Sequence, residues 1–454
     1  MKRQDRRAKY RIICYAMTAI LVLVGWFLRG PAASILAYIL AVFALVGQIT
    51  TVAHICRITG AAFYLVAAIT IVSRAITWSI QHQLFERGLR YALIHARMVH
   101  GLQKSLLETP GYSVELNHQE AKLPTIRAEF SSNMINGIIK VQNHIKYNTL
   151  LEKVNLSPAI GHYIVDQQYL TDDENWYVFE ITDGQIDWRL VFDNYSHFQA
   201  YCKRQEDYTI FIDKRTSLPL CSMLLVGETG SGKTYTLYSM ILQFLNWWMV
   251  PELYFVDPKD SSLAVISDRI APDRSAADIE EIIALLERFH DKMKERKELL
   301  KEKLPEKLDA DYRYWNMRPH VLIFDELAAF QGVVNTLDKA TRDKVAMLLR
   351  NIVLQGRQLG FFLWAVMQKS DSKDIPTAIR DNLPWKVVLG LASNTTYMTA
   401  FEHSADLPKR NFEPGEGLYT YSGKTRGPKA ISFPTLDFDI LSAVLEAANN
   451  KLAK

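Results

Sequence analysis

The sequence predicts an α/β protein in which a parallel-sheet domain follows an apolar N-terminal region and a small α+β region. Three observations predict this class. Residues 206–442 alternate short apolar runs with helix-compatible segments, which is the pattern of parallel strands joined by crossover helices. One apolar run leads into a glycine-rich loop, and another ends in two acidic residues. Hydrophobic residues make up 49% of this 454-residue chain, and the excess over a soluble protein lies in three apolar stretches near the N-terminus.

The N-terminal apolar stretches predict a helical membrane anchor. They cover residues 12–28, 34–53 and 61–72, and the first two are uncharged and close to the roughly 20 residues that cross a bilayer. A cleaved signal peptide and a buried helical hairpin are the alternatives, but further apolar sequence follows the first stretch. Arg57 and Arg74 bound the third stretch, so either it lies at the membrane interface or one of the first two does not cross.

The charge pattern predicts the orientation of this anchor. Residues 1–11 carry six basic side chains and one acidic one, which predicts a cytoplasmic N-terminus. An ATP site would also be cytoplasmic, so we expect an even number of crossings and a multi-pass protein of the cell membrane. The overall net charge of +4 allows an anionic partner without requiring one. The four cysteines (14, 56, 202 and 221) are not at metal-ligand spacing, which indicates free thiols in a reducing compartment.

The composition along the chain divides it into four regions. Residues 1–85 form the anchor, with two or three apolar segments, and residues 86–205 form a linker helix and the small α+β domain. Residues 206–442 form the ATPase domain argued below, and residues 443–454 form a C-terminal tail. The α+β domain shows no catalytic constellation, so packing or oligomerisation is its default role.

The glycine-rich loop carries the strongest chemical signal. Residues 227–234 read GETGSGKT after an apolar run, which matches the phosphate-binding loop of P-loop NTPases. Its backbone N–H groups would cradle phosphate oxygens, Lys233 would lie beside the β- and γ-phosphates, and the Thr234 hydroxyl would bind Mg²⁺. A chance match has odds on the order of one in a hundred, and the strand before and helix after lower them. The sequence therefore predicts ATP and Mg²⁺ as cofactors, held by Gly227, Glu228, Thr229, Gly230, Ser231, Gly232, Lys233 and Thr234.

Two acidic residues end the apolar run 321–324. Asp325 and Glu326 match the Walker B pattern, in which the first acid holds Mg²⁺ through its water shell and the second polarises the attacking water. A strand followed by a solvated acidic turn is the alternative. The phosphate-binding loop earlier in the chain, with helix and strand between, favours Walker B.

Other polar residues flank further apolar runs. Gln368 ends the run 361–367 and would sense the γ-phosphate or orient water, although a solvated strand terminus fits the pattern equally well. Arg357 precedes the same run, and from the residues alone a surface arginine is favoured over an arginine finger.

Together these segments resemble the FtsK/SpoIIIE family of DNA-pumping ATPases. The matching stretches are GETGSGKT (227–234), VDPKDSSLA (256–264), LIFDELAAF (322–330), GRQLGFFLWAVMQ (356–368) and IRDNLPWKVVLG (379–390). Within the family, the chain is most similar to TcpA-like conjugation coupling proteins of Gram-positive mobile elements. The resemblance implies a RecA-like P-loop NTPase motor domain that hydrolyses ATP as a homo-hexamer and threads DNA through a central pore. It also implies catalytic roles for Glu326, Gln368 and Arg357.

The same resemblance implies partners and leaves alternatives. A coupling protein would meet a relaxase and transfer-channel proteins, and would contact the DNA backbone with little sequence preference. The candidate contacts follow strand tips or lie in loops: Lys259, Lys369, Lys373 and Arg380. The family usually has Gln-Arg-Pro where this chain has Gln368-Lys369-Ser370, and a C-terminal winged-helix module is not expected.

Three other functions compete with this hypothesis. One is a chromosome-partition DNA translocase. Another is a protein-secretion ATPase of the same superfamily, which the single phosphate-binding loop disfavours. The third is a nucleotide-binding membrane scaffold without turnover, which the intact Lys233, Asp325 and Glu326 disfavour.

Overall fold

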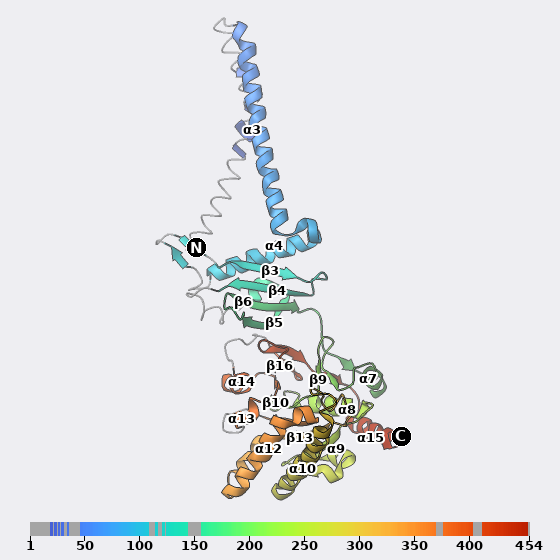
Figure 1. Ribbon diagram of the computed structural model, residues 1–454. Coiled ribbons are helices and arrows are strands. Elements are labelled where there is room, and N and C mark those ends of the chain that lie inside the picture. Colours follow the sequence, from blue (N-terminus) through green and yellow to red (C-terminus); the bar gives the residue numbers. More distant parts are fainter. Residues whose placement is uncertain are drawn as a thin grey trace. The chain divides into compact units, whose positions relative to one another are not determined.

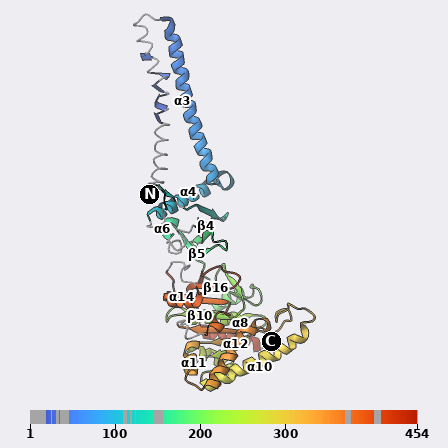
Figure 2. The ribbon, with the colours of Figure 1, turned by 60° about the vertical axis from the view of Figure 1, so that its left-hand side comes forward.

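The structure, a computed structural model, describes the part of the chain that contains both predicted motifs. The described residues are 19–20, 22–24, 26–27, 29–30, 34–35, 46–108, 114–116, 120–122, 124–143, 156–368, 376–402 and 411–452. Contacts divide the chain into two compact units (Figures 1 and 2). Unit 1 consists of Met1–Ile164 with Leu170–Asp183, and unit 2 consists of Val165–Tyr169 with Gly184–Lys454.

Unit 1 contains the long helix α3 (Val46–Gln81). Residues 54–60 contain one glycine and no proline, so the helix does not end between the second and third predicted stretches. The end of stretch 34–53 and all of stretch 61–72 therefore belong to one helix, and Arg57 and Arg74 lie inside it. The expectation that the second and third apolar stretches are separate segments is corrected accordingly.

Membrane-spanning potential lies in the C-terminal part of α3. Within the described residues, one helix is long and apolar enough to cross a bilayer, Arg57–Gln81, by length and composition. Its large apolar side chains face outward, for example Leu65 and Ile69 at 64% and 60% exposure. Most of stretch 12–28 and the first part of stretch 34–53 lie outside the described residues. The multi-pass topology is therefore not supported by the residues that the structure describes, which offer a single candidate span.

The rest of unit 1 is a helix packed on a small antiparallel sheet. Helix α4 (Leu84–Glu108) follows α3 after a turn, and its backbone leaves helical geometry at Gly88. Strand β4 (Asn136–Gln142) pairs antiparallel with β3 (Ile126–Phe130) and with β6 (Trp176–Asp183). The shorter elements are β1 (Val114–Leu116) paired with β2 (Glu120–Lys122), the helix α6 (Ser157–Ile160), and β5 (Tyr163–Leu170), whose residues are shared between the two units.

Unit 2 is built on a mixed sheet in which the motif-bearing strands are parallel. The parallel strands lie in the order β12 (Ser275–Ala276), β11 (Glu252–Val256), β13 (His320–Phe324), β14 (Phe361–Met367), β10 (Met223–Gly227) and β15 (Trp385–Leu389). Strands β16 (Glu416–Tyr421), β17 (Lys429–Ser432) and the unit 2 part of β5 extend it antiparallel. The predicted RecA-like α/β fold is confirmed, but the sheet is mixed rather than wholly parallel.

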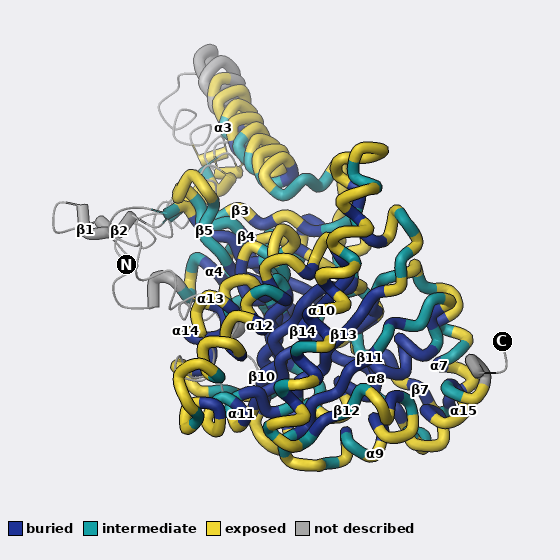
Figure 3. The backbone as a smooth tube through the Cα atoms, turned by 60° about the horizontal axis from the view of Figure 1, so that its bottom comes forward, coloured by how far each residue is buried: buried dark blue, intermediate teal, exposed yellow. Residues whose placement is uncertain are grey.

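Helices cover both faces of this sheet. Along β10, Met223 and Leu225 enter one hydrophobic core, and Leu224 and Val226 enter the other, because successive strand residues point to opposite faces. The dark blue strands in the middle of Figure 3 show how completely the sheet is buried. One face carries α7 (Tyr195–Cys202), α8 (Lys233–Asn246), α9 (Ser262–Ile270) and α15 (Ile440–Leu452); the other carries α10 (Ile279–Lys303), α11 (Leu327–Val334), α12 (Lys339–Leu359) and α14 (Asn394–Phe401).

The edges of unit 2 differ from the predicted boundaries. Its main segment begins at Gly184, upstream of the expected start at residue 206, and Phe192 and Phe198 pack with Phe211 in one core. The expected tail 443–454 falls largely on α15, where Ala443 and Val444 are buried, so these residues complete the core. The remaining elements are β7 (Val191–Phe192) with β18 (Thr435–Leu436), β8 (Thr209–Phe211) with β9 (Ser217–Pro219), a 3-10 turn (Pro272–Arg274) and α13 (Thr377–Arg380).

Candidate nucleotide site

Strand order brings the predicted motifs to one edge of the sheet. Strand β14 lies between β10 and β13 and runs parallel to both. Val226 is level with Met367, and Phe324 is level with Ala365. The segments that follow these strands therefore leave the sheet side by side at its carboxyl edge, which is where ligands bind in open α/β sheets.

The phosphate-binding loop has the backbone that its glycines permit. Gly230 and Gly232 have φ angles of 84° and 89°, in the left-handed region that other residues enter at a cost. A Cβ at Gly232 would meet the backbone nitrogen of Gly415 at 2.3 Å, and the Gly415 N–H donates to the carbonyl of Ser231 at 2.8 Å. The loop is thus tied to the segment before β16, which the sequence motif did not indicate. Helix α8 begins at Lys233, so its positive N-terminus faces the loop.

The phosphate-binding loop offers a partly buried cation and an unpaired hydroxyl to an anion. The Lys233 ammonium donates to the carbonyl of Gly227 at 3.0 Å, and burial lowers its pKa while Asp325 and Glu326 raise it. The Ser231 hydroxyl oxygen is buried without a hydrogen-bond partner in the structure. Glu228, Thr229 and Thr234 are exposed. A phosphate group fits this arrangement, because it would satisfy a partly buried cation and an unpaired hydroxyl together.

The two Walker B acids lie beside the loop in different environments. Burial and, to a smaller extent, the neighbouring Asp257 raise the pKa of Asp325 to about 6, against the opposing effect of Lys233. The Asp325 carboxylate accepts the N–H of Glu326 at 3.1 Å. Glu326 is 8% exposed and has φ 52° and ψ 51°, a left-handed conformation that a non-glycine residue adopts only under constraint.

A lysine from the neighbouring strand tip holds this glutamate. The Lys259 ammonium donates to Glu326 Oε2 at 3.0 Å, across 67 residues of sequence. Asp257 shapes the loop that carries Lys259: its carboxylate accepts N–H bonds from Lys259 and Ser261 and the Ser261 hydroxyl. Sequence reasoning noted Lys259 only as a DNA contact and gave Asp257 no role. The apolar run that ends in Asp-Pro-Lys was the available signal.

Of the remaining predicted residues, some lie at the same edge of the sheet as the phosphate-binding loop and others do not. Gln368 is exposed and directly follows β14, at the edge that also carries the loop and the acids. Arg357 lies in the last turn of α12, just before β14, and is therefore at the opposite, amino edge of the sheet. Arg380 pairs with Asp381 at 3.2 Å and is 12% exposed, so its charge is not free for DNA. Lys369 and Lys373 lie outside the described residues.

The residues present fit Mg²⁺ bound with nucleotide. Among the described residues, no group of three or more His, Cys, Asp or Glu side chains is arranged to hold a metal ion alone. Mg²⁺ bound with a nucleotide needs no such group, since it keeps water and takes phosphate oxygens as ligands, with one or two protein oxygens. Thr234 and Asp325 can supply those oxygens from α8 and the end of β13.

Comparison with known families matches this site. Residues 193–353 match the model of the FtsK/SpoIIIE family. This segment is an FtsK/SpoIIIE domain. The match begins two residues before α7 and runs past the phosphate-binding loop and both Walker B acids into α12. The FtsK/SpoIIIE domain thus contains every predicted loop residue, together with Asp325 and Glu326.

Individual relatives extend the comparison. The FtsK domain-containing protein YdcQ of Bacillus subtilis (strain 168) is 31% identical over 179 residues, which cover 39% of this chain and 36% of that protein. The chain thus spans about a third of this relative. The monomer form of the pCW3 conjugation coupling protein TcpA with ATPγS has 17% identity and a TM-score of 0.49, covering 80% of this chain and 99% of that one. EssC (ATPases 2 and 3) of Geobacillus thermodenitrificans has 15% identity and a TM-score of 0.41, covering 58% and 51%.

The family match confirms the resemblance that the motifs indicated, because residues 193–353 carry an FtsK/SpoIIIE-type P-loop ATPase domain.

Proposed function

We propose that this protein is a membrane-anchored, ATP-driven DNA translocase that acts as a coupling protein in conjugative DNA transfer. The observation that supports it most is that Asp325 and Glu326 lie beside the phosphate-binding loop within the segment that matches the FtsK/SpoIIIE model. The apolar segment Arg57–Gln81 supplies the anchor to the cell membrane. The ATPase domain then works in the cytoplasm, where ATP is available.

The site residues divide the chemistry of ATP hydrolysis between them. Lys233 and the loop N–H groups bind the phosphates, and Thr234 and Asp325 hold Mg²⁺, which neutralises charge on the transferred phosphoryl group. Glu326 takes the proton of the attacking water, since its carboxylate lies next to the loop and follows the Mg²⁺ ligand directly. Gln368 orients that water or contacts the γ-phosphate from the tip of β14.

Lys259 links hydrolysis to DNA. In the structure its ammonium donates a hydrogen bond to one carboxylate oxygen of Glu326. The same carboxylate must accept a proton from the attacking water. The Lys259 side chain is 48% exposed, so a phosphate group of DNA can reach it from outside. A lysine drawn to the DNA backbone releases the carboxylate, and hydrolysis then proceeds only when DNA is in place.

The ATPase domains assemble as a homo-hexameric ring with nucleotides between subunits. Arg357 lies at the amino edge of the sheet, away from its own phosphate-binding loop, as a finger acting on a neighbour's nucleotide requires. In a head-to-tail ring opposite faces of neighbouring copies meet. Mixing Arg357→Ala with Lys233→Ala subunits tests this: partial recovery of ATPase is expected, and no recovery in verified mixed rings contradicts a finger in trans.

A DNA-stimulated ATPase assay on the purified full chain tests the proposed function. Double- and single-stranded DNA of unrelated sequences should raise the ATPase rate, and the effect should weaken as salt rises because phosphate contacts release counterions. Replacing Lys369 and Lys373 together should flatten the salt slope by up to about two units of log K per log salt. Stimulation by a protein substrate and none by DNA would instead indicate a secretion ATPase. The relaxase and the transfer-channel proteins are the expected partners in the cell.

A further inference from the structure

Helix α4 presents two different faces. One packs in unit 1, where Tyr91, Met98 and Leu102 are each less than 5% exposed and the helix contacts β3 and α6. The opposite face, read at spacings of four residues, carries Leu89 and Leu93 at 61% and 54% exposure. Within the residues of unit 1 that the structure describes, these two leucines one turn apart are not part of the core.

The charges in the middle of α4 are all of one sign. From Leu89 to Ser105 the helix has no acidic residue, and Arg90, Arg97 and Lys104 lie on or beside the face that carries the leucines. Both arginines are exposed. An apolar stripe flanked by basic side chains is the pattern of a helix that lies on an anionic membrane surface.

The exposed face of α4 continues the apolar surface of α3. Ile76 and Ile80, at the end of the candidate membrane span, are 48% and 67% exposed, and Phe85, after the turn, is 78% exposed. Figures 1 and 2 show α4 running across the foot of α3, between α3 and the small sheet of unit 1. Because α4 packs on that sheet through its buried side, the opposite face with Leu89 and Leu93 points away from the sheet.

The corner between the two helices is held by specific bonds. His82 Nδ1 and His95 Nδ1 are 2.8 Å apart, and His95 Nε2 lies 2.9 Å from the carbonyl oxygen of Ala128 on β3. The Arg87 guanidinium donates to the carbonyl of Phe130. These bonds fix the direction of α4 relative to α3, so the orientation of the exposed face is a property of the fold.

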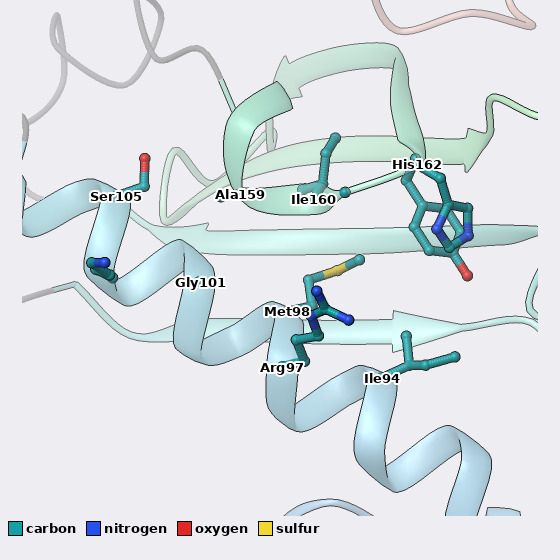
Figure 4. Close-up of a pocket in the computed structure, with 11 residues that line it drawn as sticks. Ile94, Arg97, Met98, Gly101, Ser105, Ala159, Ile160 and His162 are labelled. Carbon is teal, nitrogen blue, oxygen red and sulfur yellow. The ribbon is translucent and has the colours of Figure 1, made fainter.

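A cavity adjoins the basic half of α4. It has a volume of about 590 Å³ and is lined from α4 by Arg97, Gly101 and Lys104 and from the other side by His162 and Tyr163. Figure 4 shows Arg97 and Met98 on the side of α4 that faces Ile160 and His162. A phosphate group at the mouth of this cavity would meet the Arg97 guanidinium, whereas acyl chains would lie along Leu93 and Leu89.

We propose that α4 lies in the membrane interface and binds anionic phospholipids, with Phe85, Leu89 and Leu93 among the acyl chains and Arg90 and Arg97 at the lipid phosphates. This inference rests on the membrane anchoring in the proposed function, because α3 brings α4 to the bilayer. Each basic side chain near an anionic surface strengthens attachment about fivefold. The lipid contact would hold the α4 layer of unit 1 flat against the membrane.

The test follows the environment of position 93 in the full chain. Leu93→Cys is labelled with an environment-sensitive fluorophore in a chain carrying Cys14→Ser and Cys56→Ser, since Cys202 and Cys221 are buried. Leu299→Cys on α10 is the matched control, because Leu93 and Leu299 are both 54% exposed. Vesicles contain phosphatidylcholine alone or mixed with phosphatidylglycerol. We expect a blue shift at position 93 that is larger with phosphatidylglycerol, and none at position 299.

Arginine substitutions and an extraction experiment complete the test. Arg90→Gln with Arg97→Gln should reduce the shift to the phosphatidylcholine level, whereas Arg90→Lys with Arg97→Lys should keep it. A label at position 93 that stays in water, or one that shifts only when another protein is added, overturns the inference. Alkaline extraction of the same samples reports separately on anchoring by α3, so a failure of the proposed anchoring and a failure of the α4 contact give different results.

Discussion

Units 1 and 2 differ in how their functional residues are encoded. In unit 2 the site is made of short contiguous motifs, because each parallel strand delivers the residues after it to the same edge of the sheet. In unit 1 the proposed membrane surface is made of single residues spaced along α4, such as Leu89, Leu93 and Arg97. A phosphate-binding site needs a particular backbone conformation and is therefore encoded by a short contiguous motif. A membrane-binding surface needs only apolar area and charge and is therefore encoded by residues at helical spacing. Substitutions in the site of unit 2 and at the α3–α4 corner of unit 1 test this difference.

The largest effect is expected at the base in unit 2. Glu326→Gln should keep ATP binding and slow turnover at least about a hundredfold, as loss of a group that activates water does. Glu280→Gln, on the first turn of α10, is the control and should leave the rate unchanged. ATP affinity and single-turnover hydrolysis are the measurements. Wild-type turnover in Glu326→Gln would remove this residue from the mechanism.

The next effect concerns two glycines of the loop that share a backbone conformation. Alanine at Gly230 meets nothing within 4 Å, so Gly230→Ala should destabilise the protein by only the left-handed strain of about 1–2 kcal/mol. Gly232→Ala should destabilise it more, because its Cβ would lie 2.3 Å from the Gly415 nitrogen. Free energies of unfolding without nucleotide decide between them. Equal losses would show that the tie to Gly415 does not constrain the loop.

A smaller effect is expected from the ion pair over the catalytic glutamate. Because Lys259 is 48% exposed, the pair is worth about 1 kcal/mol or less, so Lys259→Met should raise the DNA-free ATPase rate by up to about fivefold. It should also diminish stimulation by DNA. Lys292→Met is a matched control, since Lys292 is also 48% exposed and pairs with Glu252. A Lys259→Met enzyme that is slower without DNA would show that Lys259 supports the base.

The smallest effect belongs to unit 1 and depends on pH. Burial lowers the pKa of both His82 and His95 below the ordinary value of 6.5, and His95 lowers that of His82 further. As the pH falls, the two histidines of the unfolded chain therefore bind protons at a higher pH than those of the folded chain. The contribution of this corner to the free energy of unfolding is complete above pH 6.5 and is lost as the pH falls through the lowered pKa values of the folded state. Both rings are partly solvated, so the loss should be below about 1 kcal/mol. Hydrogen exchange in α4, corrected for intrinsic rates, should show it, and His82→Asn with His95→Asn should abolish it.

The sequence predicted the parts of unit 2 that depend on strand order. Asp325 and Gln368 each follow an apolar run. Because the three strands are parallel, both residues lie at the edge of the sheet that also carries the phosphate-binding loop. The amino-edge position of Arg357 follows from the same rule, because a residue that precedes a parallel strand lies at the opposite edge from one that follows it. The antiparallel β16–β17 pair and the burial of α15 were missed, because short runs after residue 411 carry no motif and their pairing depends on tertiary contacts.

Side-chain pairing between distant segments could not be predicted. The bond between Lys259 and Glu326 joins two strand tips 67 residues apart, and a lysine in a loop has many possible partners before the fold is known. The continuity of α3 was missed for a different reason. Arg57 was interpreted as the end of an apolar segment, but a long helix tolerates one charged residue whose side chain reaches out of the apolar region.

The central claim is that this ATPase moves along DNA, and displacement of a triplex-forming strand measures it most directly. The full chain, reconstituted in vesicles, is given double-stranded DNA that carries a labelled third strand at one end. The account predicts ATP-dependent release of the third strand by the wild-type protein, on unrelated sequences, and no release by Glu326→Gln. ATP hydrolysis that is stimulated by DNA but never displaces the strand would contradict translocation.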